Sequence, residues 1–303
     1  MAGKHTKKTF EKCGKSVFDL GVMPKKTVSA PKALKVIVII TAAAITVSSA
    51  FVGNYFWQGY KNQKLLNATV ALFQSQGVKA FDTLADKNSD IKARLEIPNT
   101  QINHIVCHTD NNSFYINHNQ YKQKSRFGAL FLSSSDDFSR NGDDKNIVIM
   151  GNNMYDGSMF GVLKKYKNIN FYKENANIKL HLKNGNSENY IVFAVMVISL
   201  NESESSYKPF QSHFKDGDEF KTWLNETNQR SIIKSNIGIK YNDEFLTLMT
   251  ESDDFEGAQL AVMAKKVDEW TLSHTDLSDS SINPDTKYPN AWYTERGLEI
   301  PKN

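Results

Sequence analysis

The sequence predicts a mainly β fold, a closed or sandwiched β domain with helical insertions, preceded by one N-terminal transmembrane helix. Three observations support this prediction: an uncharged apolar stretch follows a lysine-rich end, short apolar or alternating segments recur after Pro98, and turn-rich segments separate them. The chain has 303 residues, about 40% of them hydrophobic, and only two cysteines. It is therefore neither a disulfide scaffold nor a wholly disordered protein.

The N-terminal end predicts a membrane topology. Residues 1–35 hold nine lysines and two acidic residues, a charge of +7, so the remaining residues carry −3 of the overall +4. Residues 36–60 contain no charged residue and are long enough to cross a bilayer as a helix. The positive-inside rule then places residues 1–35 in the cytoplasm and the C-terminal domain outside the cell. Because the basic excess is confined to one end, we expect no nucleic-acid partner.

This apolar segment allows two other interpretations. A buried core helix is disfavoured because the run is too long and its lysine flank is one-sided. A cleaved signal peptide is a stronger alternative, since Ser48-Ser49-Ala50 offers small residues at a cleavage site. The basic region is about twice as long as in most signal peptides, so we favour an uncleaved anchor and leave cleavage open.

Residues 61–90 form a predicted helical lead-in, because Leu65–Phe73 and Val78–Leu84 have apolar residues at helical spacing. Residues 91–267 form the predicted β domain, with helical insertions at Ser158–Tyr166 and Asp218–Asn228. Residues 268–303 lack periodicity and predict an extended or disordered tail. The predicted strands are Ile102–Cys107, Phe127–Leu132, Ile147–Met150, Ile178–Leu182, Tyr190–Ile198, Phe245–Met249 and Leu260–Val267.

Residues 91–267 contain a series of short strings, in this order: Leu95-Glu96-Ile97-Pro98, Tyr115-Ile116-Asn117-His118, Gly128-Ala129-Leu130-Phe131-Leu132, Asn146-Ile147-Val148-Ile149-Met150-Gly151, Asn153-Met154, Asp156-Gly157-Ser158-Met159-Phe160-Gly161, Phe245-Leu246-Thr247-Leu248 and the Ala258–Lys265 strand. In their order and spacing, these strings resemble class B sortases, the membrane-anchored cysteine transpeptidases of Gram-positive bacteria. The insertion between Ile198 and Phe245 is also similar to that class. The resemblance implies a closed sortase-type β-barrel.

The sequence departs from the family at all three catalytic positions that the resemblance implies. Asn152 stands where sortases have a histidine, Glu251 where they have the cysteine nucleophile, and Gln259 where they have an arginine. An asparagine cannot exchange protons near neutral pH, a carboxylate is a weak nucleophile toward an amide, and a glutamine brings no charge to an oxyanion. The site thus has a formal charge of −1 where the family has +1.

We therefore expect no intact catalytic residue and a pseudoenzyme that binds sorting-signal peptides or scaffolds surface-protein or pilus assembly, with no cofactor. Expected partners are cell-surface proteins, sorting-signal peptides and an active sortase. The alternative is an active hydrolase or transpeptidase that uses Glu251, which predicts a buried Glu251 within reach of a water position. A third alternative is a structural module without a retained groove. The expected binding residues are Asn152, Asn153, Thr250, Glu251 and Gln259.

Cys107 does not supply a substitute nucleophile, because Cys107 and His108 are adjacent in a strand and point to opposite faces. We expect a buried, inert thiol. No metal site is expected: His104, Cys107, His108 and His118 lack ligand spacing, and the acidic Glu251–Glu256 loop lacks spaced Ca²⁺ ligands.

The string Asn283-Pro284-Asp285-Thr286 in the tail is similar to the Asn-Pro-x-Thr signal that class B sortases recognise. We favour an ordinary turn, because no second apolar segment follows the string. A pseudo-substrate that folds back over the former groove is the alternative hypothesis.

Overall fold

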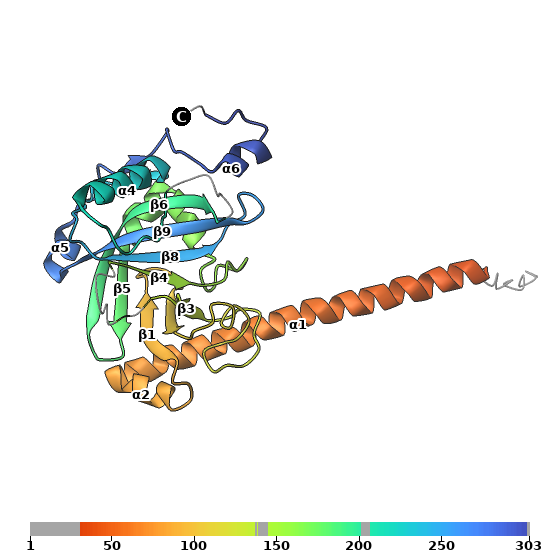
Figure 1. The fold of residues 1–303 in the computed structure, drawn as a ribbon. Coiled ribbons are helices and arrows are strands. Elements are labelled where there is room, and N and C mark those ends of the chain that lie inside the picture. Colours follow the sequence, from red (N-terminus) through yellow and green to blue (C-terminus); the bar gives the residue numbers. More distant parts are fainter. Residues whose placement is uncertain (1–30, 137, 139–144, 201–206, 302–303) are drawn as a thin grey trace, which may run out of the picture. The chain divides into compact units, whose positions relative to one another are not determined.

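The structure, a computed structural model, describes residues 31–136, 138, 145–200 and 207–301. Most of the predicted basic tail, Cys13 and part of the predicted turn Ser133–Asp144 lie outside these residues. The chain divides into two compact units, residues 1–53 and 54–303. Figure 1 shows the elements in sequence colours.

The described helices include 3-10 helices, which are written η. They are α1 Lys32–Gln76, η1 Gly77–Lys79, α2 Ala80–Ala85, η2 Leu163–Lys167, α3 Ile169–Asn175, α4 Gly217–Arg230, α5 Glu269–His274 and α6 Asn290–Glu295. The described strands are β1 Ile91–Glu96, β2 Asn103–Cys107, β3 Leu130–Leu132, β4 Asn146–Met150, β5 Asn177–Leu182, β6 Ser187–Ser199, β7 Ile233–Lys234, β8 Phe245–Glu251, β9 Ala258–Val267 and β10 Ser281–Ile282.

In the first unit, α1 carries the apolar stretch that the sequence assigns to a membrane. Its apolar side chains are exposed in the structure, for example Ile39 at 68% and Phe51 at 72%. Such a run of exposed apolar residues is unfavourable in water but suits a hydrocarbon environment. Length and composition therefore make this helix a candidate membrane span, although a signal sequence shares the same features.

Eight strands close into a barrel in the order β1-β2-β3-β4-β8-β9-β6-β5. Most neighbours are antiparallel, while β2–β3 and β4–β8 are parallel. The barrel interior is filled by apolar residues that alternate along the strands, such as Leu246 and Leu248 of β8 and Leu260 and Val262 of β9. A mainly β fold with a closed barrel and helical insertions is thus confirmed.

A second apolar cluster lies on the outer face of β6, β8 and β9 beneath α4. Phe220 and Trp223 of α4 pack there with Phe245 and Ala261. The helix begins after Asp216, whose carboxylate accepts hydrogen bonds from the amides of Asp218 and Glu219. The helix predicted at Asp218–Asn228 is thus found as α4. The helix predicted at Ser158–Tyr166 differs, because a 3-10 helix, η2, begins only at Leu163 and the α-helix α3 follows it.

The C-terminal segment differs from the extended or disordered tail that the sequence predicts. It forms α5, β10 and α6, and its aromatic residues Tyr288 and Trp292 pack against the cluster that fills the barrel. β10 pairs with β7, and the Asp268 carboxylate caps α5. Local periodicity could not predict that this segment is folded, because the segment is held by contacts with residues distant in sequence.

Candidate functional site

The candidate site lies where β4 and β8 end side by side. These strands are parallel and in register from Asn146 with Phe245 to Met150 with Met249. The Gly151 amide donates to the Met249 carbonyl at 3.2 Å, and the Thr250 hydroxyl donates to the Gly151 carbonyl at 2.7 Å. Because carboxyl ends of parallel strands share one edge, Asn152 and Glu251 leave the barrel at the same edge.

The hairpin of β8 and β9 brings the third position beside the second. Glu251 and Gln259 are directly paired across this antiparallel ladder, and Met249 pairs with Ala261 two residues further in. Since alternate strand residues share a face, Glu251 and Gln259 lie on the outer face that carries Met249 and Ala261. The fold therefore brings the predicted positions Asn152, Glu251 and Gln259 to one edge of the barrel.

The Asn152 side chain is held by the loop that precedes β3. Its Nδ2 donates to the Ile116 carbonyl at 2.7 Å and to the Arg126 carbonyl at 3.4 Å. Gly128 makes this approach possible: its φ is +66°, and a Cβ there would lie 2.5 Å from the Tyr115 carbonyl oxygen. The amide thus joins the end of β4 to a loop and acts as a hydrogen-bond donor.

Glu251 and Gln259 are in a different situation. Glu251 is exposed and Gln259 half-buried. Among the residues that the structure describes, neither side chain has a hydrogen bond or an ion pair. An exposed carboxylate lacks the desolvation that prepares a general base, so the burial expected for an enzyme using Glu251 is not found.

Two further residues were predicted to bind ligand. Thr250 is buried, and its hydroxyl is already bonded to Gly151, so it closes the barrel edge instead of facing solvent. Asn153 is half-buried and forms an isolated β-bridge with Met159. Within the predicted set, Asn152 and Thr250 are therefore engaged inside the protein, and Glu251 and Gln259 are available.

The turn between β8 and β9 contains a charged cluster that the sequence did not predict. The half-buried Asp254 accepts hydrogen bonds from Lys167 and Ser252, and Arg296 lies 3.7 Å from its carboxylate. Burial acts to raise the pKa of Asp254, but these hydrogen bonds and positive charges hold the pKa below its ordinary value. The acidic loop is thus partly neutralised from within the chain. No local pattern indicates this, because Lys167 and Arg296 are distant in sequence.

Cys107 is fully buried in a cluster with Phe81 and Tyr115, and burial raises the pKa of its thiol to about 12. A thiol held protonated in this way is a poor nucleophile, as the sequence predicted. His104 is 3% exposed, and burial lowers its pKa to about 4. Within the described ranges, no group of three or more His, Cys, Asp or Glu residues is arranged to hold a metal ion.

The Asn283–Thr286 string is docked against the connection between α4 and β7. The buried Asn283 donates through Nδ2 to the Ser231 carbonyl at 2.8 Å, and its amide donates to the Ile232 carbonyl at 2.7 Å. The Thr286 hydroxyl donates to the Asn283 carbonyl at 2.8 Å. Among the described residues, none of the string's hydrogen bonds reaches Asn152, Glu251 or Gln259. The string is a structural turn in this conformation.

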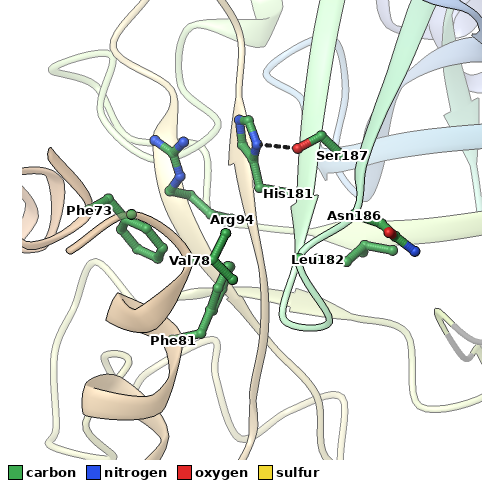
Figure 2. A pocket seen from close by; sticks show the side chains of 10 residues that line it. Phe73, Val78, Phe81, Arg94, His181, Leu182, Asn186 and Ser187 are labelled. Carbon is green, nitrogen blue, oxygen red and sulfur yellow. Dashed lines mark hydrogen bonds between the residues drawn. The ribbon is translucent and has the colours of Figure 1, made fainter.

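A separate cavity of about 150 Å³ lies between the end of α1 with η1 and α2 and the strands β1, β5 and β6 (Figure 2). Arg94 and His181 bring polar atoms to its mainly apolar wall, and the His181 Nδ1 lies 2.9 Å from the Ser187 hydroxyl. The Arg94 guanidinium lies over the Phe73 ring, 4.8 Å from its centroid. None of the three family positions lines this cavity.

Comparisons with known proteins agree with the barrel fold. No family model matches the chain. A sortase B of Listeria monocytogenes is 24% identical over 246 residues, which is 77% of this chain and 96% of that protein. The crystal structure of Clostridium perfringens sortase B is 31% identical with a TM-score of 0.56, covering 62% of this chain and 99% of that one. A Staphylococcus aureus sortase B–substrate complex, 22% identical, covers 70% of this chain and 97% of that one, with a TM-score of 0.61.

The fold is thus of the sortase type, a closed barrel whose β4 and β8 edge carries the candidate site. The chain belongs to the class B sortase family.

Proposed function

We propose that this protein is a catalytically inactive member of the sortase B family that binds sorting-signal peptides at the edge formed by β4, β8 and β9. The observation that carries the proposal is the set Asn152, Glu251 and Gln259 at the positions where the resemblance implies histidine, cysteine and arginine. Asn152 is committed to two backbone carbonyls, and Glu251 is exposed. Such a set lacks a strong nucleophile, and its asparagine cannot act as a general acid or base.

Binding is supported by what the edge still offers. Glu251 and Gln259 are neighbours across the β8–β9 ladder on one outer face, and within the described part of the chain neither side chain has a hydrogen-bond partner, so they can hydrogen-bond to a peptide main chain. A sortase B of S. aureus has been solved as a substrate complex, which supports a ligand of the sorting-signal kind for this chain. Scaffolding of surface-protein or pilus assembly beside an active sortase would use the same retained peptide.

The direct test uses residues 54–303, the compact unit that contains the barrel. Calorimetry with an Asn-Pro-x-Thr peptide is expected to show binding, and mass spectrometry of the same mixture no cleaved or transferred product. Peptide turnover that disappears in Glu251→Ala would favour the alternative, a hydrolase or transpeptidase that uses Glu251. No binding and no turnover would favour a structural module.

A second experiment tests whether the edge still positions a peptide for reaction when the family's catalytic residue types are restored. The triple variant Asn152→His, Glu251→Cys, Gln259→Arg restores the residue types that the family uses. Turnover in this variant, but not in Asn152→His with Gln259→Arg alone, is expected if the edge still binds peptide in a productive position. Binding without turnover in the triple variant would show that the edge no longer positions a scissile bond.

The membrane anchor belongs to the same proposal. We propose that the apolar part of α1 spans the membrane with residues 1–35 in the cytoplasm and the barrel outside. Its exposed apolar side chains and the preceding lysines support this orientation.

A further inference from the structure

The β8–β9 turn, residues 252–257, joins the two strands that carry Glu251 and Gln259. Two hydrogen bonds close it: the Ser252 amide donates to the Ala258 carbonyl at 2.9 Å, and the Ala258 amide donates to the Phe255 carbonyl at 3.1 Å. Phe255 is buried in the cluster that fills the barrel, which ties the middle of the turn to the core. The position of this turn therefore sets where the ends of β8 and β9 lie.

The C-terminal segment reaches this turn through Arg296. The Arg296 Nη1 donates to the Asp254 carbonyl at 3.1 Å, and its Nη2 lies 3.7 Å from the Asp254 carboxylate. Arg296 is thus hydrogen-bonded to the main chain of one turn residue and ion-paired with its side chain. A backbone contact of this kind fixes the path of the turn, which a contact between side chains alone would not do.

Arg296 is itself held in place by Trp292 of α6. Its guanidinium lies over the Trp292 ring, 4.1 Å from the centroid, and its Nη1 also donates to the Trp292 carbonyl at 3.2 Å. Trp292 stacks on Tyr288 with ring centroids 4.0 Å apart, and both pack against the cluster that fills the barrel. The residues that hold Arg296 are therefore themselves packed against the barrel.

Lys167, at the end of η2, bonds the same Asp254 carboxylate. The turn is consequently held between η2 and the C-terminal segment, with Asp254 as the shared partner. Asp254 lies three residues beyond Glu251 in the sequence, so the turn that Asp254 anchors continues directly into the strand end at the candidate site.

We infer that Arg296 is a positioning residue for the peptide site: through Asp254 it fixes the β8–β9 turn and thereby the spacing of Glu251 and Gln259. The inference deepens the proposed function and rests on it for the effect on peptide binding. It also gives the C-terminal segment a role, since Arg296, which directly follows α6, contacts the turn next to the site.

The test compares two charge-removing variants of the full chain in detergent. Arg296→Gln removes the contact with the turn. Lys234→Gln is the matched control, because Lys234 forms another ion pair with the C-terminal segment, at 3.4 Å to Asp285, and both partners are exposed. Exposed pairs of this kind contribute little, so the control should leave the segment docked.

Hydrogen exchange of the turn is the first readout. In Arg296→Gln, the Ser252 and Ala258 amides are expected to exchange at least about fivefold faster, because the closed form of the turn loses a stabilising contact. The Leu95 amide in β1 and the midpoint of global unfolding should be unchanged, which a general loss of stability would not allow. Unchanged exchange at Ser252 and Ala258, or equal acceleration in Lys234→Gln, would overturn the inference.

Calorimetry with an Asn-Pro-x-Thr peptide is the second readout, and about fivefold weaker binding is expected in Arg296→Gln only. Faster exchange with unchanged peptide affinity would overturn the positioning role. If the unsubstituted chain does not bind the peptide at all, the proposed function fails, and the exchange data alone decide whether Arg296 fixes the turn.

Discussion

At the residue scale, the Asn152 side chain has a structural role. The resemblance to sortases implies a proton-exchanging histidine at this position. In this chain the amide donates two hydrogen bonds to the carbonyls of Ile116 and Arg126. A group that holds a loop in place stabilises the fold, so the position where the resemblance implies a histidine contributes to structure in this chain.

The donor role of Asn152 can be tested with a nearly isosteric change. Asn152→Asp replaces the donating amide by a carboxylate that faces two carbonyl oxygens. We expect a loss of about 1–3 kcal/mol in the free energy of unfolding of residues 54–303 at pH 7, measured in urea. Asn153→Asp is the neighbouring control, and an equal loss in both variants would contradict the role given to Asn152.

His104 predicts a pH dependence of stability. Its pKa is lowered from 6.5 to about 4 by complete burial, so the unfolded chain binds the proton first as the pH falls. The stability associated with the neutral ring is complete above pH 6.5 and is lost as the pH falls through the folded-state pKa near 4. The whole loss is on the order of 3 kcal/mol.

The measurement is the free energy of unfolding from pH 7.5 to pH 4 for the unsubstituted chain and for His104→Phe. The variant lacks this titration, so its stability should fall less steeply between pH 6.5 and pH 4. Parallel curves for the two proteins would show that His104 does not titrate differently in the folded and unfolded states.

At the element scale, α4 illustrates an insertion that the sequence specified well. Phe220, Trp223 and Leu224 share one face in the sequence, and in the structure that face packs on β6, β8 and β9. The Asp216 carboxylate, at 3.0 and 2.9 Å from two amides, sets where the helix begins.

The N-terminal cap of α4 predicts a loss of stability in one variant and its recovery in another. Asp216→Ala is expected to lower the free energy of unfolding by about 1 kcal/mol, because two amides at the helix start lose their acceptor. Asp216→Ser keeps an acceptor at the same place and should recover most of this loss. Thermal unfolding followed by circular dichroism compares the three proteins, and no difference between Ala and Ser would mean that the cap does not stabilise α4.

The elements that the sequence predicted share strong local patterns. β6, β8 and β9 appear as apolar runs bounded by turn residues, which is the pattern of buried strands. β1 was missed as a separate strand although Ile91, Ala93 and Leu95 alternate with polar residues, a period-2 signal that could have located it. The order of residues 268–301 could not be foreseen, because Trp292 and Arg296 gain their partners only in the folded chain.

The positions of the candidate site could be predicted from the sequence, but the partners of its residues could not. The positions of Asn152, Glu251 and Gln259 followed from the family strings, and the strand pairing brings them to one edge. Their partners did not follow, because Ile116 and Arg126 lie in a loop without regular pattern and Asp254 meets Lys167 and Arg296 across long sequence separations.

At the scale of the whole molecule, charge and hydropathy divide the chain into parts with different surroundings. The +7 end precedes an apolar helical segment whose side chains are exposed, and the remaining chain, at −3, includes a barrel with its own core. Only a bilayer or another apolar environment covers such a segment favourably. The net charge of +4 therefore describes no single surface.

The two cysteines allow the proposed orientation to be tested in intact cells. Cys13 lies in the predicted cytoplasmic end, while Cys107 is fully buried with its pKa raised to about 12 and should not react with a maleimide. Asp253→Cys places a thiol on the exposed β8–β9 turn. With a membrane-impermeant maleimide, we expect labelling at position 253 in a Cys13→Ser background before lysis, and labelling of Cys13 only after permeabilisation. The opposite pattern would reverse the orientation.

A mature chain whose mass lacks the N-terminal residues, and with them Cys13, would instead establish cleavage near Ser48-Ser49-Ala50, because an uncleaved anchor must retain both cysteines.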